Sequence, residues 1–210
     1  MREQLKRIIK PNGAIVLFWS EPFSSALRMS NIKEFRYDII WEKERPTNIF
    51  FMKKQIGKVH EIISIFYKRQ PTYNPQMENS MWVNRKLIEW NESKTHLRQK
   101  YKSSNDYDYT IRYPRSVVKI NRDIKAKEFR HPTQKPVALI EYLVKTYTNE
   151  WETVLDFTAG SFTTAVAADN TKRKWIWIEM SEEYCKIWKE RIIKNRIEKW
   201  LDLLDFTSNI

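Results

Sequence analysis

The sequence predicts an α/β fold with a doubly wound sheet and a basic lobe inserted into the chain. Short apolar runs that suit buried strands alternate with amphipathic helical stretches. The run 154–164, VLDFTAGSFTT, places an acid after an apolar strand, then a small-residue turn and a helix start. In such a turn the backbone N–H groups face a ligand. A third observation is the basic, tyrosine-rich stretch that interrupts the pattern at 70–130.

Residues 1–69 are expected to form the first part of the core. Apolar residues at helical spacing predict a helix over 2–10, and a turn at 11–13 leads into a buried strand over 14–18. Residues 19–23 then lie at the carboxyl end of that strand, where doubly wound sheets hold ligands. Two further strands are expected over 37–43 and 60–68, and their linking loop contains Arg45, Lys53 and Lys54.

Residues 131–210 are expected to complete the core. Pro136 suits the first turn of a helix that continues to Tyr147. A buried strand over 154–156, a helix from 163 and a strand over 175–179 follow, and Ser181 caps a last helix. The inner face of that last helix is formed by Tyr184, Ile187, Trp188 and Ile192.

The lobe at 70–130 carries the strongest local charge. Between Arg98 and Arg130 the sequence has ten Lys and Arg and four Asp and Glu, and tyrosines are interleaved among them. A nucleic-acid contact surface and a solvated irregular insertion both fit this pattern. With the loop lysines, the candidate DNA contacts are Arg45, Lys53, Lys54, Arg98, Lys100, Lys102, Arg112 and Arg115.

The composition indicates which kinds of binding partner and which cell compartment are expected. The chain has 38 Lys and Arg against 26 Asp and Glu, a net charge of +12, which suits a polyanionic partner. The single Cys185 excludes an internal disulfide and a cysteine metal cluster, so we expect a reducing, cytoplasmic setting. No apolar stretch reaches the roughly 18 residues of a membrane helix, and His131 has no second ligand at metal spacing. We therefore expect neither a membrane partner nor a metal.

A second acid follows the next strand. Glu179 lies 23 residues after Asp156, close to the roughly 20 residues of a helical crossover. In a doubly wound sheet an acid at this place holds the ribose hydroxyls of a cofactor. The plain alternative is that both acids are strand-end residues on a solvated rim.

Five motifs taken together carry a specific resemblance. In chain order they are LKRIIKPNGAIVLFWSEPF, YPRSVVK, HPTQKP, VLDFTAGSFTT and KWIWIEMSEEYCKIWKERI. The chain resembles the amino-methylating DNA methyltransferases of bacteria and phages, in the subgroup whose cofactor motif follows the target-recognition region. The resemblance covers nearly the whole chain and is weakest in the lobe. It implies an incomplete Rossmann-like methyltransferase sheet with an inserted target-recognition lobe at 70–130.

The resemblance also implies S-adenosylmethionine as cofactor and double-stranded DNA as partner, with adenine the favoured base. The turn after Asp156 would surround the cofactor, Glu179 would bind its ribose, and the segment from His131 would close over its methionine end. The cofactor contacts so implied are His131, Pro132, Thr133, Gln134, Lys135, Pro136, Asp156, Phe157, Thr158, Ala159, Gly160, Ser161, Thr163, Thr164 and Glu179.

The chain departs from the family pattern in one catalytic element. An Asp-Pro-Pro-Tyr type tetrapeptide does not occur in the sequence, so no catalytic residue is assigned. In the family that motif lies on a strand between those expected at 154–156 and 14–18. We therefore expect a truncated or split enzyme with two unpaired strand edges, and a second polypeptide that supplies the strand.

Large aromatic residues stand where the family has glycines, at Trp19, Phe162 and Trp177. An aromatic side chain at Phe162 is expected to add bulk where the tail of the cofactor lies and to weaken its binding. Two main functions follow: a DNA methyltransferase, truncated or split, and a catalytically inactive DNA-binding remnant of one. An unrelated nucleotide-binding α/β protein would explain the acids but neither HPTQKP nor the lobe.

Overall fold

The computed structural model describes residues 2–79, 111–123, 131 and 133–207, and these form two compact units. The larger unit comprises residues 1–74 and 116–210, and the smaller unit comprises residues 75–115. In the smaller unit β4 (Glu78–Asn79) pairs antiparallel with β5 (Ile111–Arg112). Most of the predicted lobe, residues 80–110 and 124–130, lies outside the described residues.

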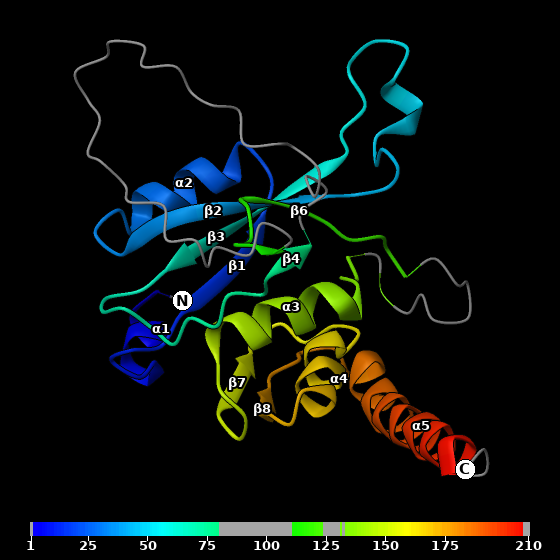
Figure 1. The fold of residues 1–210 in the computed structure, drawn as a ribbon. Helices are drawn as coiled ribbons and strands as arrows, with labels where there is room; N and C mark the ends of the chain where they lie inside the picture. The colour runs from blue at the N-terminus through cyan, green and yellow to red at the C-terminus, as the bar shows by residue number, and fades with distance from the viewer. Residues whose placement is uncertain (1, 80–110, 124–130, 132, 208–210) are drawn as a thin grey trace, which may run out of the picture. The chain divides into compact units, whose positions relative to one another are not determined.

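The first sheet of the larger unit has four strands in the order β1-β3-β2-β6 (Figure 1). These are β1 (Ile15–Trp19), β2 (Phe35–Glu42), β3 (His60–Phe66) and β6 (Val117–Lys119). The strand β3 runs antiparallel to both β1 and β2, whereas β6 runs parallel to β2. Since β6 lies in this sheet, the inserted unit ends earlier than the predicted 70–130 boundary.

The predicted cofactor loop belongs to a separate two-stranded sheet. In it β7 (Thr153–Asp156) pairs parallel with β8 (Lys174–Trp177), so Asp156 lies opposite Trp177, and α4 (Thr163–Asn170) connects the two strands. Within the described part of the chain β7 pairs only with β8, and β1 only with β3. The α/β class is confirmed, with the sheet present as two separate pieces.

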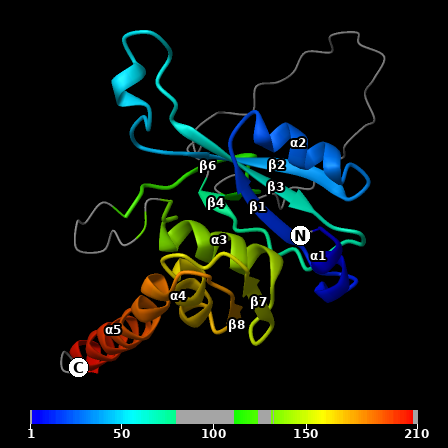
Figure 2. The same cartoon turned by 180° about the vertical axis from the view of Figure 1, so that it is seen from behind.

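The helix α3 (Val137–Tyr147) packs against both pieces (Figures 1 and 2). Leu139 and Leu143 belong to a core with residues of β2 and β3. Ile140 and Val144 pack with Ala167 of α4, and Phe18 and Val154 contact this second cluster from β1 and β7. The apolar residues of α3, which recur at helical spacing, thus pack on two faces of this helix.

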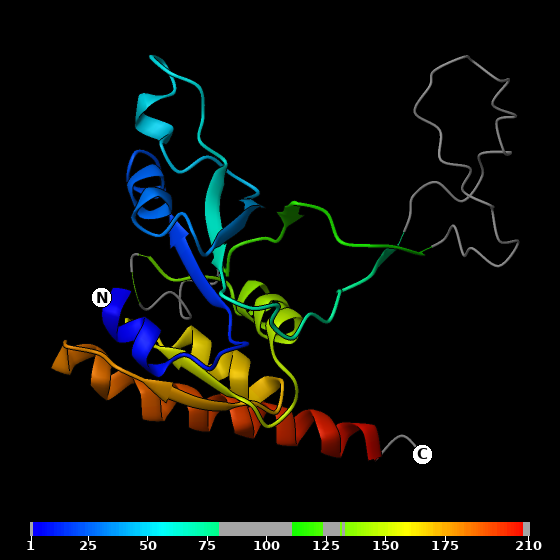
Figure 3. The ribbon, with the colours of Figure 1, turned by 90° about the vertical axis from the view of Figure 1, so that its left-hand side faces the viewer.

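The remaining helices flank these elements. α1 (Arg2–Ile8) precedes β1, α2 (Phe23–Ser30) follows it, and η1 (Ile49–Phe51) is a short 3-10 helix between β2 and β3. α5 (Glu182–Thr207) runs beside α4 and β8 (Figure 3), where Ile192 is buried and Trp188 packs against the same cluster. No helix among the described residues is long and apolar enough to cross a membrane.

The helices and strands predicted within 1–69 and 131–210 agree with the observed ones to within a few residues. The helix α2 and the strand β6 were not among the predicted elements, although Leu27 of α2 and Val118 of β6 are buried. The strand expected at 175–179 ends at Trp177, so Glu179 lies beyond the strand in the following segment.

Candidate functional site

The turn after β7 is shaped by backbone hydrogen bonds and two left-handed residues. Gly160 has φ of +49° and Phe162 has φ of +61°. The Phe162 N–H donates to the Ala159 carbonyl at 2.7 Å, and the Ala159 N–H donates to the Ile178 carbonyl at 3.1 Å. A left-handed conformation costs a non-glycine residue about 1–2 kcal/mol, so surrounding contacts must hold Phe162 in place.

Glu179 joins this turn to the segment after β8. Its Oε2 accepts the Gly160 N–H at 2.7 Å, and its Oε1 accepts the Ser181 N–H at 2.9 Å. The Ser181 N–H is the main cause that lowers the pKa of the Glu179 carboxyl, aided by the Gly160 N–H and opposed by burial. The side chain is therefore an ionised carboxylate with acceptor capacity left for a ligand.

Asp156 braces the same turn from the end of β7. Its Oδ1 accepts the Thr158 N–H at 3.0 Å, and its Oδ2 accepts the Thr164 hydroxyl at 2.6 Å. The carboxylate thereby ties the strand end to both the turn and the first residues of α4. Thr158 is exposed beside it, while Gly160 and Ser161 are buried.

His131 lies against the turn at Gly160. A Cβ built on Gly160 would be 3.4 Å from the His131 ring, and that ring packs 4.5 Å from the ring of Tyr184 between centroids. The His131 Nδ1 lies 3.2 Å from the Thr133 N–H, which donates to it. The start of the 131–136 segment therefore lies against the turn after β7.

Lys135 ties the other end of this segment to the first sheet. Its Nζ lies 3.2 Å from the Glu61 Oε2 and 5.3 Å from the centroid of the Phe18 ring. Glu61 also forms an ion pair with the buried Lys43. Burial raises the pKa of the Glu61 carboxyl, but the charges of Lys135 and Lys43 outweigh it and leave the pKa below its ordinary value.

The Phe162 ring lies in the core, whereas the sequence predicted that it adds bulk where the tail of the cofactor lies. The ring is fully buried and packs edge to face on Trp177 with centroids 4.9 Å apart. Ala165 and Ile192 complete the cluster around it. The left-handed backbone at Phe162 is thus associated with a ring in the core beneath α4.

One residue of this site was missed by sequence reasoning. The Arg191 guanidinium on α5 donates to the Ser161 carbonyl and lies 3.2 Å from the Thr163 Oγ1. It therefore clamps the end of the turn to the last helix. The available signal was a cation beside Ile192 on the predicted inner face of that helix.

The predicted DNA contacts fall into three groups. Arg45, Lys53 and Lys54 are exposed on the connection between β2 and β3. Arg112 and Arg115 lie 2.9 Å and 3.7 Å from the Glu78 carboxylate, so both are engaged within the smaller unit. Arg98, Lys100 and Lys102, like Pro132 of the cofactor set, lie outside the described residues.

The family model described as DNA methylase, for N6 and N4 methylation, matches residues 2–190. The chain belongs to this DNA methylase family. Its relatives in the family include the DNA adenine methyltransferase YhdJ of Escherichia coli (strain K12), 28% identical over 197 residues. The match covers 89% of this chain and 62% of YhdJ, so the chain spans less than two thirds of that relative's length. The orphan methyltransferase M.BamHII of Bacillus amyloliquefaciens is 30% identical over 218 residues, covering 93% of this chain and 80% of that protein.

Solved structures of this family share the fold. The M1.HpyAVI–SAM complex aligns with a TM-score of 0.62 and 24% identity, over 90% of this chain and 78% of that one. The cytosine-N4-specific PvuII DNA methyltransferase aligns with a TM-score of 0.57 and 19% identity, over 83% and 62% of the respective chains. The similar proteins thus include one named as an adenine enzyme and one solved structure named as cytosine-N4-specific.

Proposed function

We propose that this chain takes part in S-adenosylmethionine-dependent methylation of an exocyclic amino group in DNA, with adenine as the favoured base. The observation that carries the proposal is the bond from the Gly160 N–H to Glu179. It joins the turn after β7 to the acid after β8, at the carboxyl ends of two parallel strands, where α/β sheets bind nucleotides.

The residues present fit this cofactor. The ionised Glu179 carboxylate would accept hydrogen bonds from the ribose hydroxyls, and the turn from Phe157 to Ser161 would face the charged tail. The segment from His131 to Pro136 would cover the methionine end, because His131 packs against Gly160. When bound, S-adenosylmethionine supplies an electrophilic methyl group. The burial of the Phe162 ring removes the bulk that would have opposed binding.

Adenine is favoured because YhdJ, a relative matched over most of this chain, is named as an adenine enzyme. The target base is the one whose exocyclic amine fits against hydrogen-bond acceptors of the enzyme. These acceptors draw electron density onto the amine nitrogen. The product itself is the direct test, because N6-methyladenine and N4-methylcytosine separate after DNA hydrolysis.

We further propose that a second polypeptide supplies a strand between β7 and β1. Among the described residues each of these strands pairs on one side only, while Phe18 and Val154 pack on the same cluster of α3 and α4. A strand at this place would satisfy both rows of backbone groups and carry the acceptors for the target amine.

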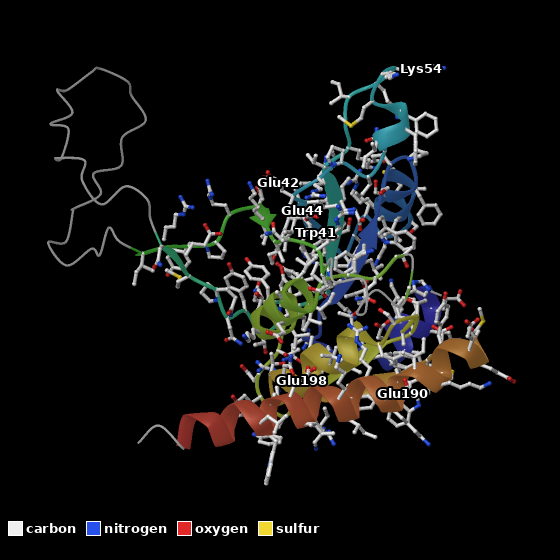
Figure 4. The ribbon with its side chains drawn as sticks, turned by 90° about the vertical axis from the view of Figure 1, so that its right-hand side faces the viewer. Trp41, Glu42, Glu44, Lys54, Glu190 and Glu198 are labelled. Carbon is white, nitrogen blue, oxygen red and sulfur yellow. The ribbon has the colours of Figure 1, made fainter. Side chains whose placement is uncertain are left out.

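The experiment measures transfer of a labelled methyl group from S-adenosylmethionine to unmodified DNA, by the chain alone and with a partner that carries an Asp-Pro-Pro-Tyr strand. Labelled N6-methyladenine that depends on Glu179 is the expected product. Glu198→Gln is the matched control, because Glu198 is an exposed glutamate on α5 (Figure 4). DNA binding without cofactor binding or labelling in either sample would instead support the inactive remnant.

A further inference from the structure

The connection between β2 and β3 projects a basic and apolar tip. We call residues 43–59 the arm. From Arg45 to His60 the sequence has four Lys and Arg and no Asp or Glu. Phe50 is 98% exposed and Ile56 is 94% exposed. Such complete exposure of an aromatic ring and a branched aliphatic chain, set among cations, is a feature of surfaces that meet a partner.

The tip is held by bonds across the arm. The Lys58 N–H donates to the Asn48 Oδ1 at 2.6 Å, the Asn48 Nδ2 donates to the Ile56 carbonyl at 3.1 Å, and the Thr47 N–H donates to the Lys58 carbonyl at 3.0 Å. A Cβ at Gly57 would lie 3.0 Å from the Pro46 Cγ, so the two sides of the arm are close together. The arm therefore presents Phe50 from a braced backbone.

The root of the arm lies next to the candidate cofactor segment. The Lys43 N–H donates to the Val59 carbonyl at 2.7 Å, and Glu61, two residues beyond Val59, forms ion pairs with both Lys43 and Lys135. Figure 4 shows Lys54 at the far end of the arm, away from Glu44 at its root. A ligand held by the tip would thus be connected through β3 to Glu61, the residue that pairs with Lys135.

We propose that the arm is a DNA wedge, in which Phe50 enters the base stack of a duplex while Lys53 and Lys54 contact the flanking phosphates. Proteins that unstack DNA combine apolar side chains inserted between base steps with cations on the backbone. The absence of acids from Arg45 to His60 favours a polyanion as the occupant of the tip. The wedge rests on the proposed function, since an enzyme that acts on a base must take it out of the stack, and a ring in the vacated space reduces that cost.

The test uses fluorescein-labelled 30-bp duplexes that are identical except for one central mismatch, where unstacking costs less. In anisotropy titrations the native chain is expected to bind the mismatched duplex about 10-fold more tightly, a preference of about 1.4 kcal/mol. Phe50→Ala removes this preference and leaves the salt dependence of binding unchanged. Phe50→Trp restores the preference, because an aromatic wedge is retained.

A second measurement distinguishes the role of Lys53 and Lys54 from the role of the Phe50 ring. Lys53→Gln with Lys54→Gln keeps the mismatch preference and reduces the slope of log K against log salt by about 1 for each lysine. Met29→Ala, an exposed apolar residue on α2, is the control and leaves both quantities unchanged. The proposal is overturned if Phe50→Ala keeps the mismatch preference.

Two further outcomes also count against the wedge. Absence of DNA binding by the native chain would overturn the DNA part of the proposed function as well. Binding to vesicles of anionic phospholipid that is lost in Phe50→Ala, with DNA binding intact, would assign the tip to a membrane surface. Intact methyl transfer together with an unaffected mismatch preference in Phe50→Ala would remove the wedge and leave the proposed function standing.

Discussion

Phe162 and Trp177 pack edge to face, with ring centroids 4.9 Å apart and ring planes inclined by 84°. The resemblance to the methyltransferase pattern implies glycines at both positions, and the two aromatic rings contact each other. Such a pair contributes about 0.5–1.5 kcal/mol beyond the area it buries. The two departures are therefore parts of one packing arrangement next to the turn after β7.

The first prediction concerns this pair. Phe162→Ala is expected to lower the free energy of unfolding by about 3–5 kcal/mol, because it leaves a cavity in the core. Phe162→Gly is expected to cost about 1 kcal/mol less than alanine, since glycine accepts φ of +61° without strain. Urea unfolding measures both values. Phe50→Ala, which removes a fully exposed ring, is the control and should stay within about 0.5 kcal/mol of the native chain.

The second prediction concerns Glu179. Glu179→Gln keeps the side-chain shape but removes the charge that accepts the Gly160 and Ser181 N–H groups. Hydrogen bonds to a charged group are worth about 1.5–3 kcal/mol, so S-adenosylmethionine affinity is expected to fall about 10- to 100-fold. Calorimetric titration measures it. If Glu179→Gln binds S-adenosylmethionine as tightly as the control Glu198→Gln does, then Glu179 does not contact the cofactor.

The third prediction compares two arginines of α5. Arg191→Met removes the clamp on the Ser161 carbonyl and should cost about 1.5–3 kcal/mol of stability, with weaker cofactor binding because the turn loosens. Arg196→Met breaks an ion pair with Asp169 in which the arginine is exposed, and should cost at most about 1 kcal/mol. Thermal and urea unfolding give the stabilities. Equal effects of the two changes would refute the role assigned to Arg191.

The fourth prediction is a pH dependence through Glu61. Its pKa is lowered in the folded chain, so its ion pairs with Lys43 and Lys135 stabilise the fold above the ordinary pKa near 4.5 and lose this effect as the pH falls through the lowered value. Glu61→Gln should cost on the order of 3 kcal/mol at pH 7, because Lys43 is left buried without its partner.

The measurement for Glu61 is urea unfolding from pH 3 to pH 7 in both proteins. The difference in stability between the native chain and Glu61→Gln should be constant above about pH 5.5 and shrink below pH 4.5. Glu42→Gln is the control, since its partner Lys119 is exposed and lies 3.7 Å away. A difference that does not change with pH would contradict the assignment.

Local patterns in the chain predicted most helices and strands of the larger unit and drew attention to Asp156 and Glu179. The helix over 137–147 shows a 3.6-residue apolar period, and the strand before Asp156 is a short apolar run, so both follow from the nearest neighbours in sequence. The spacing of Asp156 and Glu179 follows from the length of a helical crossover. The helix α2 was missed because its apolar face is short and Phe23 on it is exposed.

The sequence by itself determined the α/β class and the family motifs, and it predicted the turn after Asp156 as the place where the cofactor binds. The tertiary structure alone decided which distant residues meet: His131 against Gly160, Arg191 on the Ser161 carbonyl, and Lys135 on Glu61. Only the tertiary structure showed that the Phe162 ring is buried in the core. Hydrophobic periodicity and turn chemistry act over a few residues, whereas these contacts join positions about 30 to 74 residues apart and depend on how helices and strands pack.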